Sequence, residues 1–348
     1  MAASTAAIPE KMQSGLYFGH DDIRVVQRPV PAIGPNEVLA SVIACGICGS
    51  DTMRWYREPQ TRKLGTGINT GHEISGQIVQ AGENIKHLRP GQRVVITHHF
   101  PCQECGACKS GNETACPSMH KKHIDPGGFA QFVRVLESGI GLGLYPLPDS
   151  MSYEEGSFVE PLGCVVRSIR KTAPFEGQSI LVLGSGLAGL LHIRMARAFG
   201  ARRICAVDMN RQRLDAAAES GADELRFASE TLPASDKIYV CTGAPSASLQ
   251  ALELVNPGGQ IMFFAADGPE KKLEIPLTKY WTSQPSILFS YGAAPRDMRE
   301  ALDLIAAGRV KVSDLVTHRF PLDKMSEAFD LFDNPRDTSL KIIIEPNR

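Results

Sequence analysis

Cysteine, histidine and carboxylate side chains gather in one short stretch of the sequence, between residues 45 and 73. It contains Cys48-Gly-Ser50 followed by an aspartate and, further on, His72 next to Glu73. Thiolate and imidazole are ligands that suit Zn²⁺, a borderline-soft ion. A catalytic zinc keeps one coordination position open, so three or four protein groups suffice to hold it. We therefore expect the chemistry of this protein to take place here.

A second group of thiols lies within residues 100–117 and has the spacing C-x2-C-x2-C-x7-C, formed by Cys102, Cys105, Cys108 and Cys116. Four thiolates this close cannot easily all form unstrained disulfides, but they can surround one ion. A site closed by four cysteines has no position for a substrate, so we expect a structural zinc. An iron–sulfur cluster, which thiolates also hold, is the alternative.

A glycine-rich loop stands between an apolar run that ends at Leu183 and a pattern typical of a helix, and it reads Gly184-Ser-Gly186-Leu187-Ala188-Gly189. The next apolar run ends at Asp208. In this context the glycines allow the backbone to approach a pyrophosphate at the helix N-terminus, and the acidic residue accepts hydrogen bonds from the ribose. The pattern predicts a site for a nicotinamide dinucleotide.

Asp208 also bears on the choice between NAD and NADP. Its carboxylate repels a 2′-phosphate, which favours NAD. Arg211 and Arg213 follow closely and would attract that phosphate, so NADP is the alternative. We expect Arg213, Thr242 and Ser290 to contact the cofactor as well, Thr242 because loops at the C-terminal ends of parallel strands face it.

Two kinds of element must position these residues. Up to about residue 148 the sequence has short strands and turns, including strands at 37–44 and 74–79, which is typical of a small barrel-like β domain. At Ser152 a helix is expected to begin, with Glu155 at the capping-box position. From residue 178 apolar strands alternate with helices, which predicts a doubly wound α/β sheet. The connection at 221–235 has no helical pattern, so a trimmed crossover is expected.

The composition excludes several classes of protein. Lys+Arg 37 against Asp+Glu 38 gives no basic excess, so neither nucleic acid nor an anionic membrane is an expected partner. No apolar run is long enough to cross a bilayer, and residues 1–9 lack the pattern of a secretory signal. Most of the nine cysteines are clustered as metal ligands would be, so we expect a reducing, cytoplasmic location.

Together these motifs resemble the zinc-dependent medium-chain dehydrogenase/reductase family over essentially the whole chain, and best its polyol (sorbitol) and threonine dehydrogenase-like branch. The resemblance is carried by Cys48-Gly-Ser50-Asp51, Gly71-His72-Glu73, the four cysteines, Glu160-Pro161-Leu162 and the glycine-rich loop. It implies a GroES-like β domain interrupted by a Rossmann domain. We accordingly expect residues 1–154 to form the catalytic domain, 155–291 the cofactor domain, and 292–348 to return to the catalytic domain.

The resemblance also implies roles for individual residues. Cys48 and His72 would be zinc ligands, and Glu73 and Glu160 stand where members of this branch bind the metal directly, through water or in alternation. Glu160 stands before Pro161, where a helix break is expected. Without the resemblance, this glutamate would be interpreted as an ordinary solvated residue. Alcohol dehydrogenases have cysteine at its position, which favours the polyol branch.

Two departures from the family pattern affect the site. Many members have histidine two residues after the aspartate of the Cys-Gly-Ser-Asp turn, where it passes the proton outward, but this chain has Met53. Thr70 replaces the usual proline before Gly-His-Glu, for which we have no functional explanation. Trp55, Tyr56 and Phe100 are candidates for the pocket wall, although ordinary packing is the alternative for Trp55 and Tyr56.

The reaction implied by the resemblance is hydride transfer between NAD(P) and a secondary alcohol, namely a polyol, sugar, cyclitol or amino alcohol. Ser50 would relay the proton. One alternative is a zinc-independent quinone or enone reductase, which the intact Cys48, His72 and Glu73 disfavour, and another is a non-catalytic NAD-binding scaffold or redox sensor. The expected cofactors are two zinc ions per chain and NAD. Members of the family associate, so a homodimer or homotetramer is expected.

Overall fold

A computed structural model of the chain describes residues 7–266, 268–335 and 339–348. Its contacts divide the chain into two compact units. The first unit comprises residues 1–160, 294–307 and 312–348, and the second comprises residues 161–293 and 308–311. The chain thus leaves the first unit after Glu160 and returns to it at Ala294, whereas the sequence predicted boundaries after residues 154 and 291.

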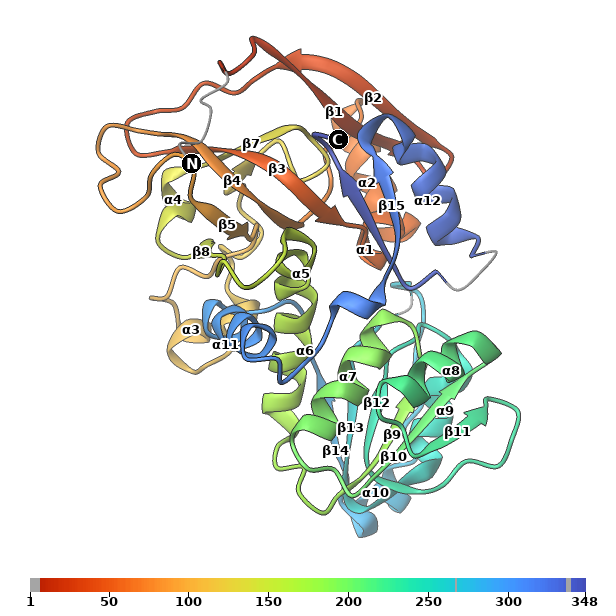
Figure 1. Cartoon of the computed structure of the whole chain (residues 1–348). Coiled ribbons are helices and arrows are strands. Elements are labelled where there is room, and N and C mark those ends of the chain that lie inside the picture. The colour runs from red at the N-terminus through yellow and green to blue at the C-terminus, as the bar shows by residue number, and fades with distance from the viewer. Residues whose placement is uncertain (1–6, 267, 336–338) are drawn as a thin grey trace. The chain divides into compact units, whose positions relative to one another are not determined.

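The first unit is built on a mainly antiparallel sheet in which the strand order is β15-β16-β3-β4-β5-β8, and β7 pairs with β3 and β6 (Figure 1). A separate two-stranded ribbon is formed by β1 and β2. The strands of this unit are β1 Lys11–Gly19, β2 Asp22–Pro29, β3 Val38–Gly46, β4 Glu73–Ala81, β5 Arg93–Ile96, β6 Ile124–Asp125, β7 Phe132–Val135, β8 Leu144–Pro146, β15 Val316–Pro321 and β16 Lys341–Glu345.

Strand β3 is the central strand of this sheet, and its residues are mostly buried between β4 and β16. It delivers the chain to Cys48, and β4 begins at Glu73 directly after His72. Strand β16 is the last strand of the chain, and Ile344 on it pairs with Cys45 on β3. The fold therefore brings the C-terminal strand beside the cysteine and histidine stretch.

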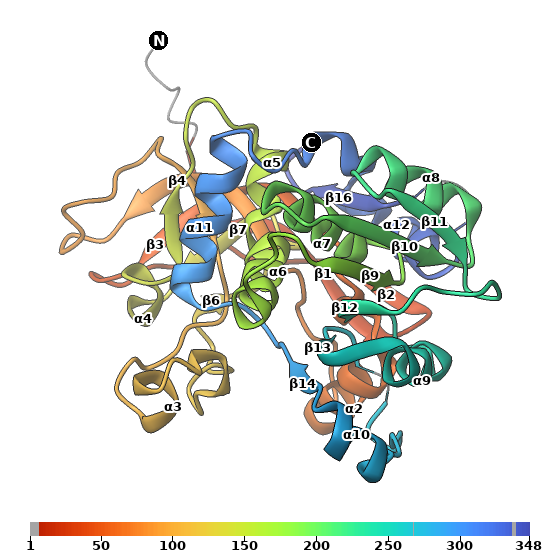
Figure 2. The ribbon, with the colours of Figure 1, turned by 90° about the horizontal axis from the view of Figure 1, so that it is seen from below.

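Helices of the first unit are short and mostly lie in its loops, namely α1 Gly49–Thr52, α2 Arg54–Leu64, α3 Gly106–Lys109, α4 Glu137–Ile140, α5 Tyr153–Ser157, α11 Pro295–Ala306 and α12 Met325–Asp333, with 3₁₀ turns at Glu113–Ala115, Ser313–Leu315 and Leu322–Lys324. The loop that carries α3 extends away from the strands of the sheet in both views (Figure 1 and Figure 2).

The capping box predicted at Ser152 is present. Ser152 Oγ accepts a hydrogen bond from the Glu155 backbone N–H at 3.1 Å, and Glu155 accepts one from the Ser152 N–H at 2.8 Å. The predicted helix break at Glu160-Pro161 is misplaced: α5 ends at Ser157, and α6 already begins at Val159. Pro161 lies in the first turn of α6, where its missing N–H is not needed.

The second unit is a six-stranded parallel sheet in the order β11-β10-β9-β12-β13-β14, the order of a doubly wound nucleotide-binding fold. Strand β9 has all five residues buried, as expected of a parallel strand covered on both faces. The elements of this unit are α6 Val159–Thr172, β9 Ser179–Leu183, α7 Leu187–Ala198, β10 Arg203–Asp208, α8 Arg211–Glu219, β11 Glu224–Phe227, β12 Ser235–Val240, α9 Pro245–Leu254, β13 Val255–Phe263, α10 Leu277–Ser283 and β14 Ser286–Phe289.

The connection between α8 and β12 has no helix, as predicted, but it contributes the edge strand β11, which the sequence analysis missed. The residues of β11 are only half-buried or exposed, so its hydrophobic pattern is weak. Helix α10 and strand β14 were also missed, and both carry exposed apolar side chains. Among the described helices, none is both long and apolar enough to cross a membrane.

Candidate active site

The structure brings three of the predicted metal ligands together. The Cys48 sulfur, a His72 ring nitrogen and a Glu73 carboxylate oxygen all lie within 4.8 Å of one another. Cys48 follows β3 and precedes α1, while His72 and Glu73 stand at the beginning of β4, the neighbouring strand. One thiolate, one imidazole and one carboxylate form a donor set that suits a catalytic zinc with an open position.

A buried carboxylate holds His72 in place. Asp51 Oδ1 lies 3.4 Å from His72 Nδ1 and accepts a hydrogen bond from the Gly71 N–H at 3.3 Å. Its other oxygen accepts from the Cys48 N–H at 3.1 Å, so one side chain ties both ligand segments together. Burial disfavours the charged imidazole, but Asp51 and the Cys48 sulfur outweigh it and raise the pKa of His72 well above its usual range. Such a partner fixes the ring nitrogen that faces a metal.

Asp51 was part of the motif, but the sequence analysis gave it no role. Burial would raise its pKa, yet the neighbouring His72 and Arg57 lower it. Arg57 lies on α2 with its Nη2 3.3 Å from Asp51 Oδ1, and its Nε donates to the Ser50 carbonyl at 2.7 Å. The aspartate in Cys-Gly-Ser-Asp was the one signal available, because acidic groups beside metal-binding histidines commonly orient them.

Glu73 forms an ion pair with Lys341, and both side chains are buried, with 1% and 0% exposed. Lys341 also donates to the Ile47 carbonyl at 3.3 Å. A glycine is required beside this pair, because a Cβ on Gly46 would lie 2.0 Å from Glu73 Oε2 and 2.4 Å from Lys341 Cε. Sequence reasoning missed Lys341, since no local pattern links it to a residue 268 positions away.

The other predicted residues of this site lie in different environments. Ser50 donates a hydrogen bond to Cys48 Sγ at 3.6 Å. Glu160 is buried at the start of α6, but among the described residues it is not in the group whose donor atoms lie within 4.8 Å. Thr70 is buried, and its hydroxyl has no hydrogen-bond partner in the described part of the chain.

The three residues predicted to line the pocket lie in different parts of the first unit. Trp55 is partly exposed on α2, and its ring lies 5.9 Å from that of Tyr56. Phe100 is instead a core residue: it is buried, its ring lies 4.4 Å from that of His123, and it fills the space beside Gly143. Met53 is half-buried between α1 and α2.

A row of imidazole rings begins at the metal-ligand candidates. Ring centroids are 4.8 Å apart for His72 and His98, 3.5 Å for His98 and His99, and 4.8 Å for His99 and His120. Burial and the neighbouring His99 lower the pKa of His98 well below its usual range. Burial together with His120 lowers the pKa of His99 to about 3. The sequence analysis assigned no role to this row.

The four cysteines of the lobe are close enough to share one ion. The sulfur of Cys105 lies 3.5 Å from that of Cys108, and the sulfur of Cys116 lies 3.5 Å from that of Cys102. Tetrahedral zinc with bonds of about 2.3 Å holds its sulfurs roughly 3.8 Å apart, whereas an iron–sulfur cluster is larger and spreads its ligands further. The Cys102 N–H donates to the Cys116 sulfur at 3.2 Å and lowers the pKa of that thiol to about 6. The geometry therefore favours a single zinc.

The glycines of the glycine-rich loop stand where a side chain would be crowded or where the backbone faces open space. Gly184 follows β9 with φ +95°, and a Cβ there would lie 3.0 Å from Thr242 Cβ. A Cβ on Gly189 would lie 1.9 Å from the Gly184 carbonyl oxygen, so helix and strand can pack only around glycine. Gly186, the N-cap of α7, faces open space, which leaves room for a pyrophosphate. Leu187 and Ala188 form the first turn of that helix.

The remaining predicted cofactor residues lie at the C-terminal ends of the parallel strands or just beyond them. Asp208 ends β10, and its two carboxylate oxygens accept hydrogen bonds from the Ser185 and Asn210 backbone N–H groups at 2.8 and 2.9 Å. Arg213 is half-buried on α8. Ser290 follows β14, and its buried hydroxyl has no hydrogen-bond partner among the described residues, as expected of a group that contacts a cofactor.

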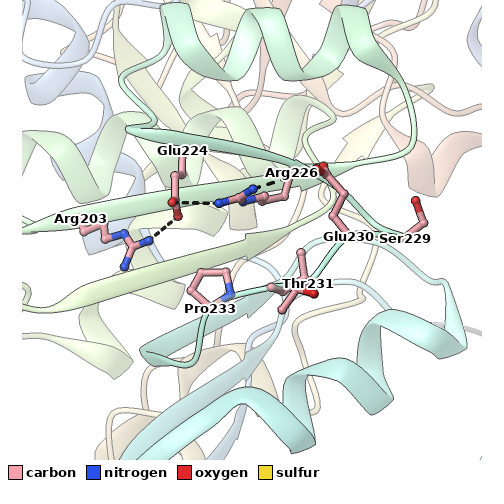
Figure 3. Close-up of a pocket in the computed structure, with 8 residues that line it drawn as sticks. Arg203, Glu224, Arg226, Ser229, Glu230, Thr231 and Pro233 are labelled. Atoms are coloured by element: carbon pink, nitrogen blue, oxygen red, sulfur yellow. Dashed lines mark hydrogen bonds and ion pairs between the residues drawn. The ribbon is translucent and has the colours of Figure 1, made fainter.

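A pocket in the same unit is not this cofactor site. It is lined by Arg203, Glu224, Arg226, Glu230 and neighbouring residues (Figure 3). Arg203 and Glu224 are the first residues of β10 and β11, so they stand at the opposite ends of their strands from Asp208. Both arginines pair with Glu224, and Arg226 also pairs with Glu230, so the two positive charges are balanced by two negative ones.

Comparison with known proteins identifies relatives along the whole chain. Residues 34–149 match the family described as "Alcohol dehydrogenase GroES-like domain", and residues 188–307 match "Zinc-binding dehydrogenase". The sorbitol dehydrogenase of Macaca fascicularis is 31% identical over 364 residues, which cover 98% of this chain and 98% of that protein.

Solved structures have the same fold. The 2R,3R-butanediol dehydrogenase of Bacillus subtilis superimposes with a TM-score of 0.83 at 26% identity and covers 97% of this chain and 100% of its own. The alcohol dehydrogenase of Thermus sp. ATN1 gives 0.82 at 27% identity and covers 96% and 99%. These likenesses confirm the predicted GroES-like and Rossmann folds. The match to a zinc-binding dehydrogenase and the sorbitol dehydrogenase relative bear out zinc and a nicotinamide cofactor. The chain belongs to the zinc-dependent medium-chain dehydrogenase/reductase family and is an alcohol or polyol dehydrogenase.

Proposed function

We propose that this enzyme oxidises one secondary hydroxyl group of a polyol or diol to a ketone, with NAD as hydride acceptor, and catalyses the reverse reduction. The observation that carries the proposal is the group formed by Cys48, His72 and Glu73, whose donor atoms lie within 4.8 Å of one another. When bound there, zinc supplies a Lewis acid that lowers the pKa of an alcohol hydroxyl. The names of the sorbitol and butanediol dehydrogenases support the choice of substrate class.

Each residue of the group has a proposed part. Cys48, His72 and Glu73 would hold the zinc, with Asp51 fixing the orientation of the imidazole. Ser50 Oγ lies 3.6 Å from the sulfur of Cys48, so its hydroxyl is beside a proposed metal ligand and would carry the proton away. Glu160 would enter only as an exchanging ligand, because it is outside the 4.8 Å group of described residues. Cys102, Cys105, Cys108 and Cys116 would hold the structural zinc.

NAD is the proposed cofactor in preference to NADP. Two backbone N–H groups hold the Asp208 carboxylate at the end of β10, where it would accept hydrogen bonds from the adenosine ribose and repel a 2′-phosphate. Gly184, Gly186 and Gly189, with the first turn of α7, would hold the pyrophosphate. Arg213, Thr242 and Ser290 complete the proposed contacts.

The protein is proposed to act as a homodimer or homotetramer in the cytoplasm. Strand β14 is the edge of the parallel sheet, and Phe289 on it is 68% exposed. Trp281 and Leu277 on the preceding helix are 80% and 78% exposed, and an exposed apolar edge of this kind is typical of a protein interface. Cys48 and the four cysteines of the lobe lie in groups that could each hold a metal ion, and metal-bound thiolates are typical of a reducing compartment.

The test is the rate of reduced-nicotinamide formation with a panel of polyols, diols, sugars, cyclitols and amino alcohols. It is run with NAD and NADP in parallel, before and after zinc removal by a chelator and again after zinc is restored. We expect turnover of polyols or diols with NAD that disappears with the chelator and returns with zinc. Turnover that persists in fully zinc-free protein would contradict the metal assignment, and a protein that binds NAD but oxidises no alcohol would favour the scaffold alternative.

A further inference from the structure

His98 lies beside the metal-ligand candidates and has no part in the reaction described above. Strands β4 and β5 are antiparallel, with Ile74 opposite Ile96 and Ser75 opposite Val95. Continued by two residues, the same register sets His98 opposite His72. The two ring centroids are in fact 4.8 Å apart, so the segment that follows β5 places His98 next to the metal group.

The imidazole of His98 has an unused hydrogen-bonding group. Its Nδ1 is buried and has no hydrogen-bond partner among the described residues. A buried nitrogen without a hydrogen-bond partner destabilises the fold, so native proteins seldom keep one that has no task. The ring centroids of His99 and His72 lie 3.5 and 4.8 Å from that of His98, so its ring is in contact with both. Rotation of the His98 imidazole by half a turn about its Cβ–Cγ bond leaves the ring in the same space. The rotation exchanges the positions of its nitrogen and carbon atoms, so a nitrogen can face either side.

We propose that His98 is a specificity-determining residue that binds a second hydroxyl group of the substrate, next to the hydroxyl that is oxidised. This inference rests on the proposed function. An imidazole can both donate and accept a hydrogen bond, which is what a hydroxyl group requires of its partner. A site built in this way rejects an analogue that lacks the hydroxyl, because the nitrogen is then left unpaired. The enzyme should therefore select vicinal diols and polyols over mono-alcohols.

Butane-2,3-diol and butan-2-ol form a matched pair for the test, since they differ by one hydroxyl group. In His98→Phe the ring remains but its nitrogens are lost, and kcat/KM for the diol should fall about 10- to 100-fold. The value for butan-2-ol should stay within about twofold. His98→Asn keeps a donor and an acceptor and should recover part of the loss. His120→Phe makes the same change at the exposed end of the imidazole row and should leave both substrates unaffected.

Binding provides a second readout that does not depend on turnover. Zinc content is measured for each variant, and the diol is titrated calorimetrically into the zinc-loaded enzyme with NADH bound. We expect two zinc ions per chain in every variant and weaker diol binding in His98→Phe alone. Equal losses for diol and mono-alcohol, or unchanged diol binding in His98→Phe, would overturn the role of His98 while the proposed function stands. A wild-type enzyme that oxidises neither alcohol nor any polyol would instead contradict the proposed function, and this inference with it.

Discussion

At the scale of single residues, the buried ion pair of Glu73 and Lys341 is the feature of the site that tolerates substitution least. Both side chains are almost fully buried, and Gly46 leaves just enough space for them. Two buried charges are stable only because each compensates the other, so the loss of one partner is far more costly than the loss of both. The pair also joins the last strand of the chain to the segment that carries His72.

Lys341→Met should therefore destabilise the zinc-free protein strongly, because it leaves the Glu73 carboxylate buried without a cation beside it. Removal of one partner of such a pair costs about 3–5 kcal/mol, which corresponds to a fall in Tm on the order of 10 °C. The double variant with Glu73→Gln should recover much of that fall. Differential scanning calorimetry of zinc-free protein checks this, because zinc would itself compensate the Glu73 charge, and a double variant no more stable than Lys341→Met would show that the charges are not coupled.

At the scale of elements, the two zinc sites depend on different kinds of segment. The cysteine lobe is a loop with only the short helix α3 and one 3₁₀ turn, so its own backbone contributes little stability. The Cys48 and His72 site is instead held by β3 and β4, which pair along their length. A closed four-thiolate site supplies folding energy to such a loop, whereas an open site on paired strands serves chemistry.

Cys105→Ser and Cys48→Ala should accordingly differ in their effects on stability and on turnover. Each should lower the zinc content from two ions to one per chain. Cys105→Ser should reduce Tm and make the lobe sensitive to proteolysis, since the loop loses its cross-link. Cys48→Ala should abolish turnover while Tm changes little and NAD still binds. Metal analysis, calorimetry and NADH fluorescence titration distinguish the two variants. Retained turnover in Cys48→Ala would show that Cys48 is not a ligand of the catalytic zinc.

At the scale of the whole molecule, we expect a second copy of the protein to cover the exposed edge of the parallel sheet. Strand β14 is the outermost strand of the sheet on its side, and Phe289, Trp281 and Leu277 add exposed apolar surface around it. Edges of this kind are usually covered or blunted with charge. A second copy that pairs through β14 would cover both the backbone groups and the side chains, which is why we expect an isologous dimer.

Phe289→Lys should dissociate that assembly, because a charge at the centre of the interface must be desolvated when the strands pair. Light scattering coupled to size-exclusion chromatography should show a smaller species than the wild type. Leu64→Lys, which replaces another exposed apolar residue on α2, is the matched control and should leave the mass unchanged. A wild-type protein that is already monomeric, or a Phe289→Lys variant that stays assembled, would contradict an interface at β14.

The amino-acid sequence by itself determined the family, the two folds and the chemistry of the cofactors. Closely spaced ligands such as Cys48, His72 and the four cysteines are local patterns, and so is the glycine-rich loop between strand and helix. The capping box at Ser152 is equally local and was predicted correctly. The weakly patterned β11, α10 and β14 were missed, because half-exposed elements lack a clear hydrophobic period.

Tertiary structure alone decided which distant side chains meet. Lys341 reaches Glu73 because the last strand of the chain is inserted beside β3, and His98 faces His72 because β4 and β5 pair in one particular register. Phe100 belongs to the core, although it stands one residue after the imidazole pair. Contacts of this kind depend on strand order and register, which are set by the packing of the whole sheet, and no local spacing in the sequence records them.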